Sequence, residues 1–298
     1  MNLAPIVLFT YNRPWHTAQT LRSLADNLLS NESELIIYVD GPKPNAPEDN
    51  IKNILLVREL VQKQTWCKKL TVNISTKNKG LSNSIIDGVS ETLKTYDRII
   101  VLEDDMILSP HFLEFMNEAL EKYQDIENVI SIHGYCLPID YPEPVFLLKG
   151  ADCWGWGTWR RGWDLFNPDS QLLMAQLKDK KLQYQFDLNG SYPYTKMLNY
   201  QIRGKVDSWA IRWHASAYLQ NKLTLYPGKS LVQNIGGDGS GTHSQNEEHT
   251  KTILKTDKII LKDIPVVESC MAKKLIIERL TRNLSLKNRF IKIIRALR

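Results

Sequence analysis

The sequence predicts an α/β fold in which helices cover both faces of a mainly parallel sheet. Over the first hundred residues, short apolar segments alternate with segments of helical spacing. The fourth apolar segment, residues 99–102, is rich in β-branched residues and has no polar residue, which is typical of a strand buried on both faces. Polar clusters directly follow three of these segments. Strands joined by helices usually run parallel, so this order indicates a doubly covered sheet.

The expected elements follow one another in a regular order. The expected strands are residues 5–10, 35–39, 70–74 and 99–102, and the expected helices between them are residues 17–29, 51–64 and 81–93. Each helical segment repeats its apolar residues three or four positions apart, whereas the strands are short and apolar. A proline-rich loop, residues 42–47, separates the second strand from its helix. The carboxyl ends of these strands should share one edge, where open α/β sheets bind ligands.

Composition sets further limits on the class of protein. The 298 residues are 43% hydrophobic and 24% charged, enough for one large α/β domain or two smaller ones and unlike a disordered chain. The four cysteines show no C-x-x-C spacing, which argues against a zinc site or a disulfide framework and favours a reducing, cytosolic setting. The apolar segment at residues 6–9 is too short for a signal sequence or a membrane span, and we expect neither.

Three polar clusters should meet at the carboxyl edge of the sheet. Tyr11, Asn12 and Arg13 follow the first strand, Asp40 follows the second, and the acids at residues 103–105 follow the fourth. Adjacent carboxylates repel one another, so three in a row at this edge suggest a cation or a polar ligand, although a solvated acidic turn would explain them too. Together the clusters favour a crevice for a nucleotide-like ligand.

The sequence lacks the usual phosphate-binding loops. Neither G-x-G-x-x-G after the first strand nor G-x-x-x-x-G-K-[ST] is present, so a dinucleotide or P-loop site is not expected. A divalent metal held by the carboxylates could bind a diphosphate instead and act as a Lewis acid.

Two loops of the second half carry further signals. Residues 154–159 place three tryptophans among glycines; indole rings stack on the C–H faces of sugars, but a buried tryptophan cluster is the alternative. Residues 236–241 contain four glycines and are followed by His243. This composition suits a loop that closes over a bound ligand, with His243 as a metal ligand or diphosphate contact, or else an ordinary surface loop.

Taken in order, four motifs resemble those of GT-A glycosyltransferases. They are T-Y-N-R-P at 10–14, V-D-G-P at 39–42, N-K-G-L at 78–81 and E-D-D at 103–105. The similarity spans roughly residues 5 to 245 and is closest to the Glu-Asp-Asp branch typified by N-acetylglucosaminyltransferases, and to bacterial transferases of surface polysaccharide. The resemblance implies a hexosyltransferase that uses Mn²⁺ or Mg²⁺ and a nucleotide-sugar donor, a UDP-sugar above all, with a glycan or lipid-linked saccharide as acceptor.

The same resemblance implies roles for individual residues. Asp105 would bind the metal, Asp104 the ribose or donor sugar, and Asp40 the nucleoside, while Asn12 and Arg13 would line the nucleotide pocket. The other donor-binding residues of these motifs would be Thr10, Tyr11, Lys79 and Gly80. The tryptophan loop resembles the glycine-tryptophan loop of GT-A enzymes, so Trp154 and Trp156 would contact sugar, leaving Trp159 and Trp163 to the core. The resemblance also supports His243 as a metal ligand.

Asp207 is the candidate catalytic base. An inverting transferase needs a carboxylate that accepts the proton of the attacking hydroxyl. Asp207 resembles the base in the Asp-Trp motif of the Glu-Asp-Asp branch, but this chain has Asp-Ser-Trp where that motif often has Asp-Asp-Trp. Because Asp is favoured at helix N-caps, Asp207 could instead cap the helical segment that follows.

Basic residues are concentrated at the carboxyl end. The net charge is +5, yet residues 273–298 contain nine Lys or Arg and one Glu, a charge of +8, which leaves −3 for residues 1–272. Ser285 could cap an amphipathic helix with an apolar side that includes Leu286 and Phe290. Such a helix binds anionic membranes, or it docks on the core through its apolar side. Nucleic acid is not expected as a partner, since the rest of the chain is slightly acidic.

These observations predict two parts. Residues 1–270 would form the GT-A domain, with a nucleotide-binding half at 1–110 and an acceptor-binding half at 111–270, and residues 271–298 would form a basic amphipathic segment. We expect a cytoplasmic protein, peripheral on the inner face of the membrane.

Two other functions stay open. A sugar nucleotidyltransferase would release pyrophosphate, although it normally has a glycine-rich basic first loop; a non-catalytic carbohydrate-binding protein would bind sugar without nucleotide.

Overall fold

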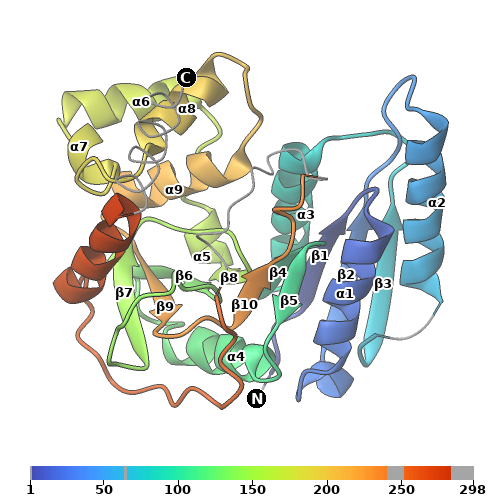
Figure 1. The fold of residues 1–298 in the computed structure, drawn as a ribbon, viewed down its shortest axis with the longest axis horizontal. Helices are drawn as coiled ribbons and strands as arrows, with labels where there is room; N and C mark the ends of the chain where they lie inside the picture. The colour runs from blue at the N-terminus through green and yellow to red at the C-terminus, as the bar shows by residue number, and fades with distance from the viewer. Residues whose placement is uncertain (1, 64–65, 240–251, 283–298) are drawn as a thin grey trace, which may run out of the picture.

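The computed structural model describes residues 2–63, 66–239 and 252–282 of the chain. Within these residues, the central sheet has eight strands in the order β3-β2-β1-β4-β8-β6-β9-β7 (Figure 1). Strands β1 to β4, β6 and β9 run in one direction, and β7 and β8 run against them. A smaller sheet pairs β5 with β10 in antiparallel fashion. The predicted α/β fold with a mainly parallel sheet is therefore confirmed.

The strands are short, and those at the centre of the sheet are buried. Their bounds are β1 Ile6–Thr10, β2 Glu34–Val39, β3 Lys69–Ile74, β4 Arg98–Glu103, β5 Met106–Leu108, β6 Val129–His133, β7 Val145–Lys149, β8 Trp156–Trp159, β9 Leu223–Pro227 and β10 Val232–Asn234. Every residue of β1 is buried, because the strand lies between two neighbours and under helices on both faces.

Helices connect the strands and cover the sheet. Their bounds are α1 Pro14–Ala25, α2 Glu48–Gln62, α3 Leu81–Thr95, α4 Phe112–Lys122, α5 Arg160–Trp163, α6 Ser170–Asp179, α7 Gln183–Phe186, α8 Tyr194–Ile202 and α9 Trp209–Leu219, with a 3₁₀ turn, η1, at Ser30–Glu32. Residues 270–282 are also helical. None of the helices in the described part of the chain is long and apolar enough to cross a membrane.

The expected elements of the first hundred residues are all present, but two helices begin earlier than expected. α1 starts at Pro14, and α2 starts at Glu48 after Pro47. Proline is favoured at the first helical position because its fixed φ suits the helix, and acidic residues in the first turn, such as Glu48 and Asp49, interact well with the helix dipole. These signals extend both helices ahead of their apolar repeats.

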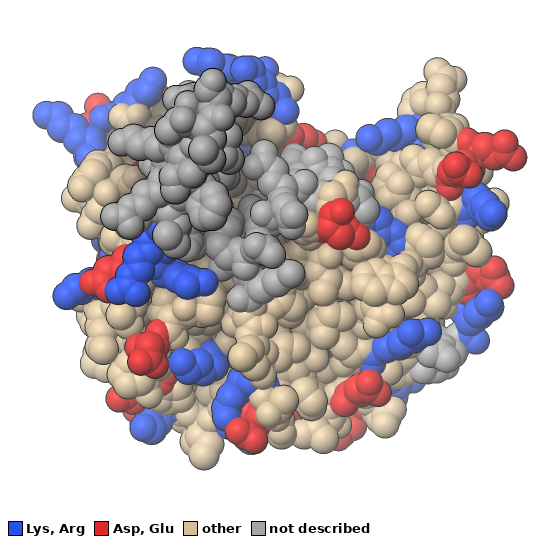
Figure 2. Space-filling view, in the orientation of Figure 1, with Lys and Arg blue, Asp and Glu red and all other residues tan. Residues whose placement is uncertain are grey.

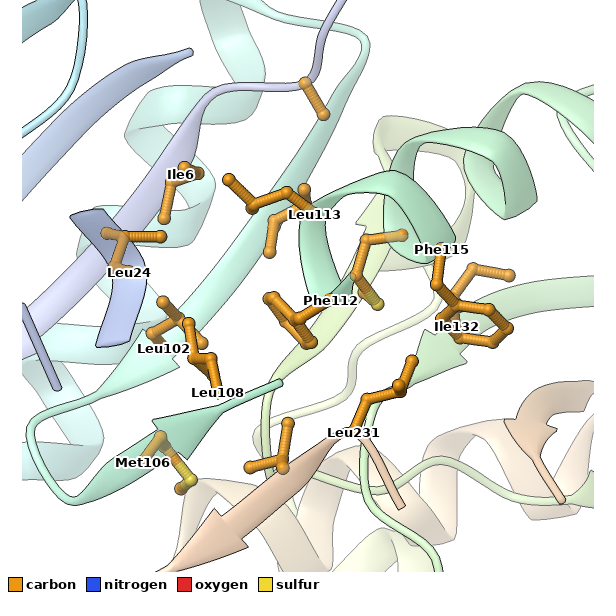
Figure 3. Close-up of a cluster of buried hydrophobic side chains, with 14 of the residues drawn as sticks. Ile6, Leu24, Leu102, Met106, Leu108, Phe112, Leu113, Phe115, Ile132 and Leu231 are labelled. Atoms are coloured by element: carbon orange, nitrogen blue, oxygen red, sulfur yellow. The ribbon is translucent and has the colours of Figure 1, made fainter. Parts of the chain in front are cut away.

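Two apolar clusters hold the helices on opposite faces of the sheet. On one face, α1, α2 and α4 pack against β1, β2 and β4. Figure 3 shows α4 at the centre of this cluster, where Phe112, Leu113 and Phe115 lie among side chains from β4, β5 and β6. On the other face, α3, α5 and α9 cover the same strands together with β8.

The remaining helices cover the second half of the chain. Helices α6, α7 and α8 pack with α9 at one end of the molecule, far from α2 (Figure 1). The helix of residues 270–282 packs on β7 and β9, and its Ala272, Ile276 and Leu280 are buried beside Phe146 and Leu148. This part of the predicted basic segment therefore docks on the sheet. The helix expected after Ser285 lies outside the described residues.

Candidate active site

A large cavity runs along the carboxyl edge of the sheet and joins both halves of the chain. Its volume is about 1160 Å³. On one side it is lined by the residues after β1, β2 and β4; on the other it continues between β7 and β9 and helices α7 to α9. A pocket of this size can take a ligand of several sugar or nucleoside units. It contains most of the candidate residues that the sequence indicates.

An acidic cluster lies at the end of β4 and faces Arg13. Asp104 and Asp105 are 5% and 8% exposed. Nη2 of Arg13 forms an ion pair with Asp104 and donates to Oδ2 of Asp105 at 2.8 Å. Arg13 lies between β1 and α1, and β1 is the strand next to β4. This position places Arg13 beside the carboxyl end of β4. The sequence placed these three residues at one edge, and the structure brings them into direct contact.

The pKa values of this cluster reflect burial and mutual repulsion. Burial raises the pKa of Asp104 to about 6, although the charge of Arg13 opposes this shift. Burial and the charges of Asp105 and Asp104 raise the pKa of Glu103 to about 8. Burial acts to lower the pKa of Arg13, but the two aspartates raise it above its ordinary value. The cluster thus carries more negative than positive charge, and Arg13 is the cation that pairs with its two aspartates.

The oxygens of this cluster are of the kind that Mg²⁺ and Mn²⁺ prefer. Asp104 and Asp105 offer carboxylates, and Asn234 donates to Asp105 Oδ1 at 3.3 Å. Gly236 lies against the same carboxylate: a Cβ at this position would come within 2.2 Å of Asp105 Oδ2. The described residues contain no group of three or more His, Cys, Asp or Glu around a common point. Two hard oxygen donors that need positive charge nevertheless fit a divalent ion whose remaining ligands come from a diphosphate.

The expected second metal ligand, His243, lies outside the described residues, as does most of the glycine-rich loop. The start of that loop is described. Gly236 N donates to Asn234 Oδ1 at 2.8 Å, and Asp238 Oδ2 lies 3.1 Å from Nε2 of His16. β10 and these contacts therefore hold the beginning of the loop beside Asp105.

Asp40 joins two loops at this edge of the sheet. Its Oδ1 accepts hydrogen bonds from the backbone N–H groups of Gly41 and Lys79, both at 2.8 Å. Its Oδ2 accepts from Asn78 Nδ2 at 2.9 Å and from Gly80 N at 3.0 Å. A carboxylate has about four acceptor positions, and protein groups fill them here. Asp40 thus ties the loop after β2 to the loop before α3, and it also lines the cavity, so its contact with a nucleoside stays a prediction.

The other donor-side candidates divide into two groups. Thr10, Tyr11 and Asn12 line the cavity, and Asn12 is held by a 2.7 Å hydrogen bond from its Nδ2 to Asn50 Oδ1. Gly80 also lines it and adopts a φ of +77°, which favours glycine.

Lys79 does not line the cavity. Its Nζ pairs with Asp87 at 2.8 Å on the exposed side of α3. The expectation that the Lys79 side chain binds the donor is therefore wrong. The backbone N–H of Lys79 donates to Asp40 and so helps to hold the loop.

The tryptophan loop contributes one side chain to the cavity, not two. Trp154 is half-buried, lines the cavity and meets the ring of Tyr135 edge-on at 4.7 Å. Trp156 is 0% exposed and packs against Trp209 and Trp213. The predicted sugar contact of Trp156 is therefore wrong, since its indole belongs to the core.

The same loop confirms two core residues. Trp159 and Trp163 are buried, as predicted. Gly155 has a φ of +62°, and a Cβ there would meet Val232 at 2.7 Å, so this glycine is required by packing.

Asp207 lines the cavity from the segment before α9. Its side chain is 58% exposed, and Oδ1 accepts from Nη2 of Arg212 at 3.2 Å. The N-cap of α9 is Ser208, which accepts a hydrogen bond from the backbone N–H of Ile211. Asp207 is thus not the cap, and within the described residues its Oδ2 has no hydrogen-bond partner.

Arg212 links this segment to the donor side. It is 9% exposed, donates from Nε to the Ser208 carbonyl at 3.1 Å, and bonds through Nη2 to Ser82 near the start of α3. The motif containing Asp207 is therefore held against the loop of Lys79 and Gly80.

The deeper half of the cavity was largely unforeseen from the sequence. Here Asp152 lies among aromatic rings, and Tyr226 Oη donates to its Oδ2 at 3.0 Å. Tyr194 stacks on His214 at 4.3 Å, and both line the cavity. Asp152 directly precedes the tryptophan loop, and this position in the sequence was the one indication that it lies near the site. Its ring partners come from α8, α9 and β9, which no local pattern connects.

Comparison with known proteins gives one sequence match. Residues 6–141 match the family model described as glycosyl transferase family 2. This region contains β1 to β4, Arg13 and the acidic cluster, but not the tryptophan loop or Asp207. No curated protein sequence matches the chain.

Several solved structures share a similar arrangement at low identity. S. aureus TarS is 14% identical, with a TM-score of 0.38 over 77% of this chain and 36% of its own. A UDP-glucose pyrophosphorylase complexed with UDP-glucose is 15% identical, with a TM-score of 0.36 over 76% of this chain and 90% of its own.

Mouse xyloside xylosyltransferase 1 in its apo form is 12% identical, with a TM-score of 0.29 over 45% of this chain and 53% of its own. These scores are too low to support an argument about function. Residues 6–141, which build the acidic edge, are similar to glycosyl transferase family 2, and this match covers slightly less than half of the chain.

Proposed function

We propose that this protein is a metal-dependent, inverting glycosyltransferase that moves a hexose from a nucleotide sugar to a hydroxyl of a glycan or lipid-linked saccharide. The observation that carries the proposal is the buried pair Asp104 and Asp105, which faces Arg13 inside a cavity of about 1160 Å³. This cluster lies within the region that matches glycosyl transferase family 2. The cluster therefore offers carboxylate oxygens to a metal ion and the guanidinium of Arg13 to a diphosphate.

The donor would lie along the edge next to β1. Thr10, Tyr11 and Asn12 line this part of the cavity and offer hydroxyl and amide groups to a nucleoside, for which we propose uridine. Asp105 would hold Mn²⁺ or Mg²⁺, and Asp104 beside it would contact the ribose or the donor sugar. When bound, the ion neutralises the diphosphate and stabilises the leaving nucleotide. Arg13 would then be free to turn from the aspartates to the phosphate oxygens, for which a guanidinium is well suited.

Asp207 is proposed as the general base. Its Oδ2 would accept the proton of the acceptor hydroxyl while the hydroxyl oxygen forms a bond to the anomeric carbon. The bond from that carbon to the phosphate oxygen breaks at the same time, and its electron pair leaves with the nucleoside diphosphate. Attack from the face opposite the leaving group inverts the anomeric centre. Arg212, bonded to Asp207 Oδ1, holds the carboxylate in place.

Ligand binding tests the proposal before any acceptor is known. We expect UDP with Mn²⁺ to raise the melting temperature of the protein more than UDP alone or Mn²⁺ alone. Asp105→Asn should lose the part of the shift that needs Mn²⁺, because it removes the charge that attracts the ion. Asp87→Asn is a matched control: this carboxylate is exposed on α3 and pairs only with Lys79 among the described residues.

Clear outcomes contradict the proposal. If no nucleoside diphosphate shifts the melting temperature with Mn²⁺ or Mg²⁺ present, the donor site does not exist. Release of pyrophosphate from a nucleoside triphosphate and a sugar phosphate would identify a sugar nucleotidyltransferase instead. Binding of free sugars without any nucleotide would identify a carbohydrate-binding protein.

A further inference from the structure

The deeper half of the cavity forms a chamber walled by aromatic side chains. We call it the aromatic chamber and define it by Asp152, Tyr192, Tyr194, His214, Tyr226 and Phe146, all of which line the cavity. Tyr192 meets Tyr194 at 4.5 Å and Tyr194 stacks on His214, which forms a wall from the side of α8 and α9. Phe146 stacks on Tyr226 at 5.4 Å and forms a wall from β7 and β9.

Asp152 is the carboxylate among the residues that define the chamber; Lys149 and Glu268 also line the cavity. Its Oδ2 accepts the hydrogen bond of Tyr226, but among the described residues its Oδ1 has no hydrogen-bond partner and the carboxylate forms no ion pair with Lys or Arg. Burial, and then the charge of Asp152, raise the pKa of Tyr226 and of Tyr194 well above the ordinary value. The phenols therefore stay protonated and can donate hydrogen bonds. The open oxygen of this half-buried carboxylate can accept a hydrogen bond from a ligand in the cavity.

The chamber adjoins the acidic cluster. Cys153 follows Asp152 and lines the same cavity. Burial, and then the charges of Glu103, Asp152 and Asp105, raise the pKa of Cys153, so these carboxylates all lie near its thiol. A ligand in the chamber would thus end close to the proposed metal and donor.

The last described helix contributes to the wall of the chamber. Ile276 and Leu280 line the cavity from residues 270–282. Glu268 just before this helix accepts a hydrogen bond from the backbone N–H of Lys149 on β7 at 3.2 Å and pairs with Lys273 at 2.9 Å. These contacts fix the helix against the sheet, which gives the chamber a built wall on this side.

We propose that the aromatic chamber is the acceptor subsite and holds one saccharide unit, whose apolar C–H face lies on the rings and whose hydroxyl donates to Oδ1 of Asp152. This rests on the proposed function, because it places the acceptor of that transfer. A purely apolar chain would leave the carboxylate without a partner, which is costly, whereas a sugar offers both an apolar face and hydroxyl donors. Asp152 then determines which acceptors bind.

Saturation-transfer NMR with simple glycosides tests the subsite without turnover. The probes are methyl β-D-glucoside, methyl β-D-galactoside and methyl N-acetyl-β-D-glucosaminide, each titrated against the full chain. We expect at least one to bind, and Asp152→Ala to weaken it by ~10-fold or more, since a hydrogen bond to a charged group is lost. Asp152→Asn keeps the shape of the side chain and should weaken binding less. Asp179→Asn, at the exposed end of α6, should bind as the unchanged protein does.

The nucleotide melting shift, measured on the same variants, separates the two proposals. The inference is supported if glycoside binding falls in the Asp152 variants while the shift with UDP and Mn²⁺ is kept. It is overturned if no glycoside binds, if both Asp152 variants bind as tightly as the unchanged protein, or if tetramethylammonium binds the chamber in preference to all three glycosides. If Asp152→Ala does not fold, Asp152→Asn decides alone: unchanged affinity overturns the inference and weaker binding supports it. If the unchanged protein binds a glycoside but shows no melting shift with UDP and Mn²⁺, the proposed function is overturned instead.

Discussion

Two aspartates at the same sheet edge have different surroundings. Asp40 accepts four hydrogen bonds from neutral groups of the neighbouring loops. Asp105 has a guanidinium on one oxygen and a 3.3 Å amide contact on the other, and it borders a large cavity. The residue type and the position after a strand are alike. The two carboxylates differ in the number of donors that the fold supplies to each, and a sequence pattern does not report that number.

Buried histidines provide a test at the scale of single residues. His133 is 2% exposed, and burial lowers its pKa from 6.5 to about 4. The unfolded chain therefore binds a proton more readily, so the stability from this group is complete above pH 6.5 and is lost as the pH falls towards 4. Between pH 7 and pH 5 we expect a loss of about 2 kcal/mol in the free energy of unfolding from His133 alone.

His133→Gln isolates this effect. Glutamine keeps an acceptor for the N–H of Trp154, which His133 Nε2 now accepts at 3.0 Å, but it does not titrate. Urea unfolding of both proteins at pH 7 and pH 5 gives the difference directly. The comparison is needed because the raised pKa of Glu103 acts in the opposite direction, adding stability that is lost as the pH rises from about 4.5 to about 8. An equal pH dependence of both proteins would contradict the prediction.

At the scale of elements, the sequence predicts local features well and long-range ones poorly. β1, β2 and β4 carry their signal in their own apolar residues, and so their positions could be read directly. β8 could not, because Trp156–Trp159 lies in an aromatic and glycine-rich stretch and gains its strand character by pairing with β4 and β6. The burial of Trp156 likewise depends on α9, which lies far along the chain.

The contact between α9 and α3 gives a prediction at this scale. Arg212→Met removes the hydrogen bonds to Ser82 and to the Ser208 carbonyl, and we expect the free energy of unfolding to fall by about 1 to 3 kcal/mol. It also removes the partner of Asp207, so turnover should fall. Arg212→Lys keeps the charge but not the fork of donors and should give intermediate values.

Unfolding in urea and steady-state turnover measure the two effects. Arg203→Met is the control, because Arg203 is an exposed arginine at the end of α8. An Arg212→Met protein as stable as the unchanged one would show that α9 and α3 are held by apolar packing alone.

At the scale of the whole molecule, the sequence located the acidic edge and missed the aromatic chamber. Arg13, Asp40 and the acids after β4 follow neighbouring parallel strands, and the rule that such strands end at one edge was enough to group them. The chamber draws its side chains from β7, β9, α8, α9 and the last helix. Because antiparallel insertions and crossovers bring these elements together, no order of motifs along the chain predicts them.

The basic end of the chain offers a further prediction. Figure 2 shows Lys and Arg side chains gathered where Figure 1 draws the helix of residues 270–282, and this helix contains Lys273, Lys274, Arg279 and Arg282. A protein that ends at residue 282 keeps the docked apolar residues but loses five of the nine basic residues counted from 273 onwards. We expect it to bind anionic vesicles at least ~10-fold more weakly at low salt, because each basic residue near such a surface contributes about 1 kcal/mol.

Vesicle sedimentation with and without phosphatidylserine measures this change. Neutral vesicles serve as the control for apolar binding, and the melting temperature should stay close to that of the full chain. Equal binding of both proteins to anionic vesicles would remove the proposed membrane contact.

The contribution of residues 270–282 to the chamber has a consequence for the order in which the molecule is completed during synthesis. The acidic edge is built from residues within the first 105, whereas the chamber needs Ile276 and Leu280. A growing chain thus possesses Arg13, Asp104 and Asp105 long before the acceptor wall can close. The carboxylates proposed to serve the activated sugar are therefore synthesised early, and the compartment proposed for the receiving hydroxyl is finished only after residue 280 has been added.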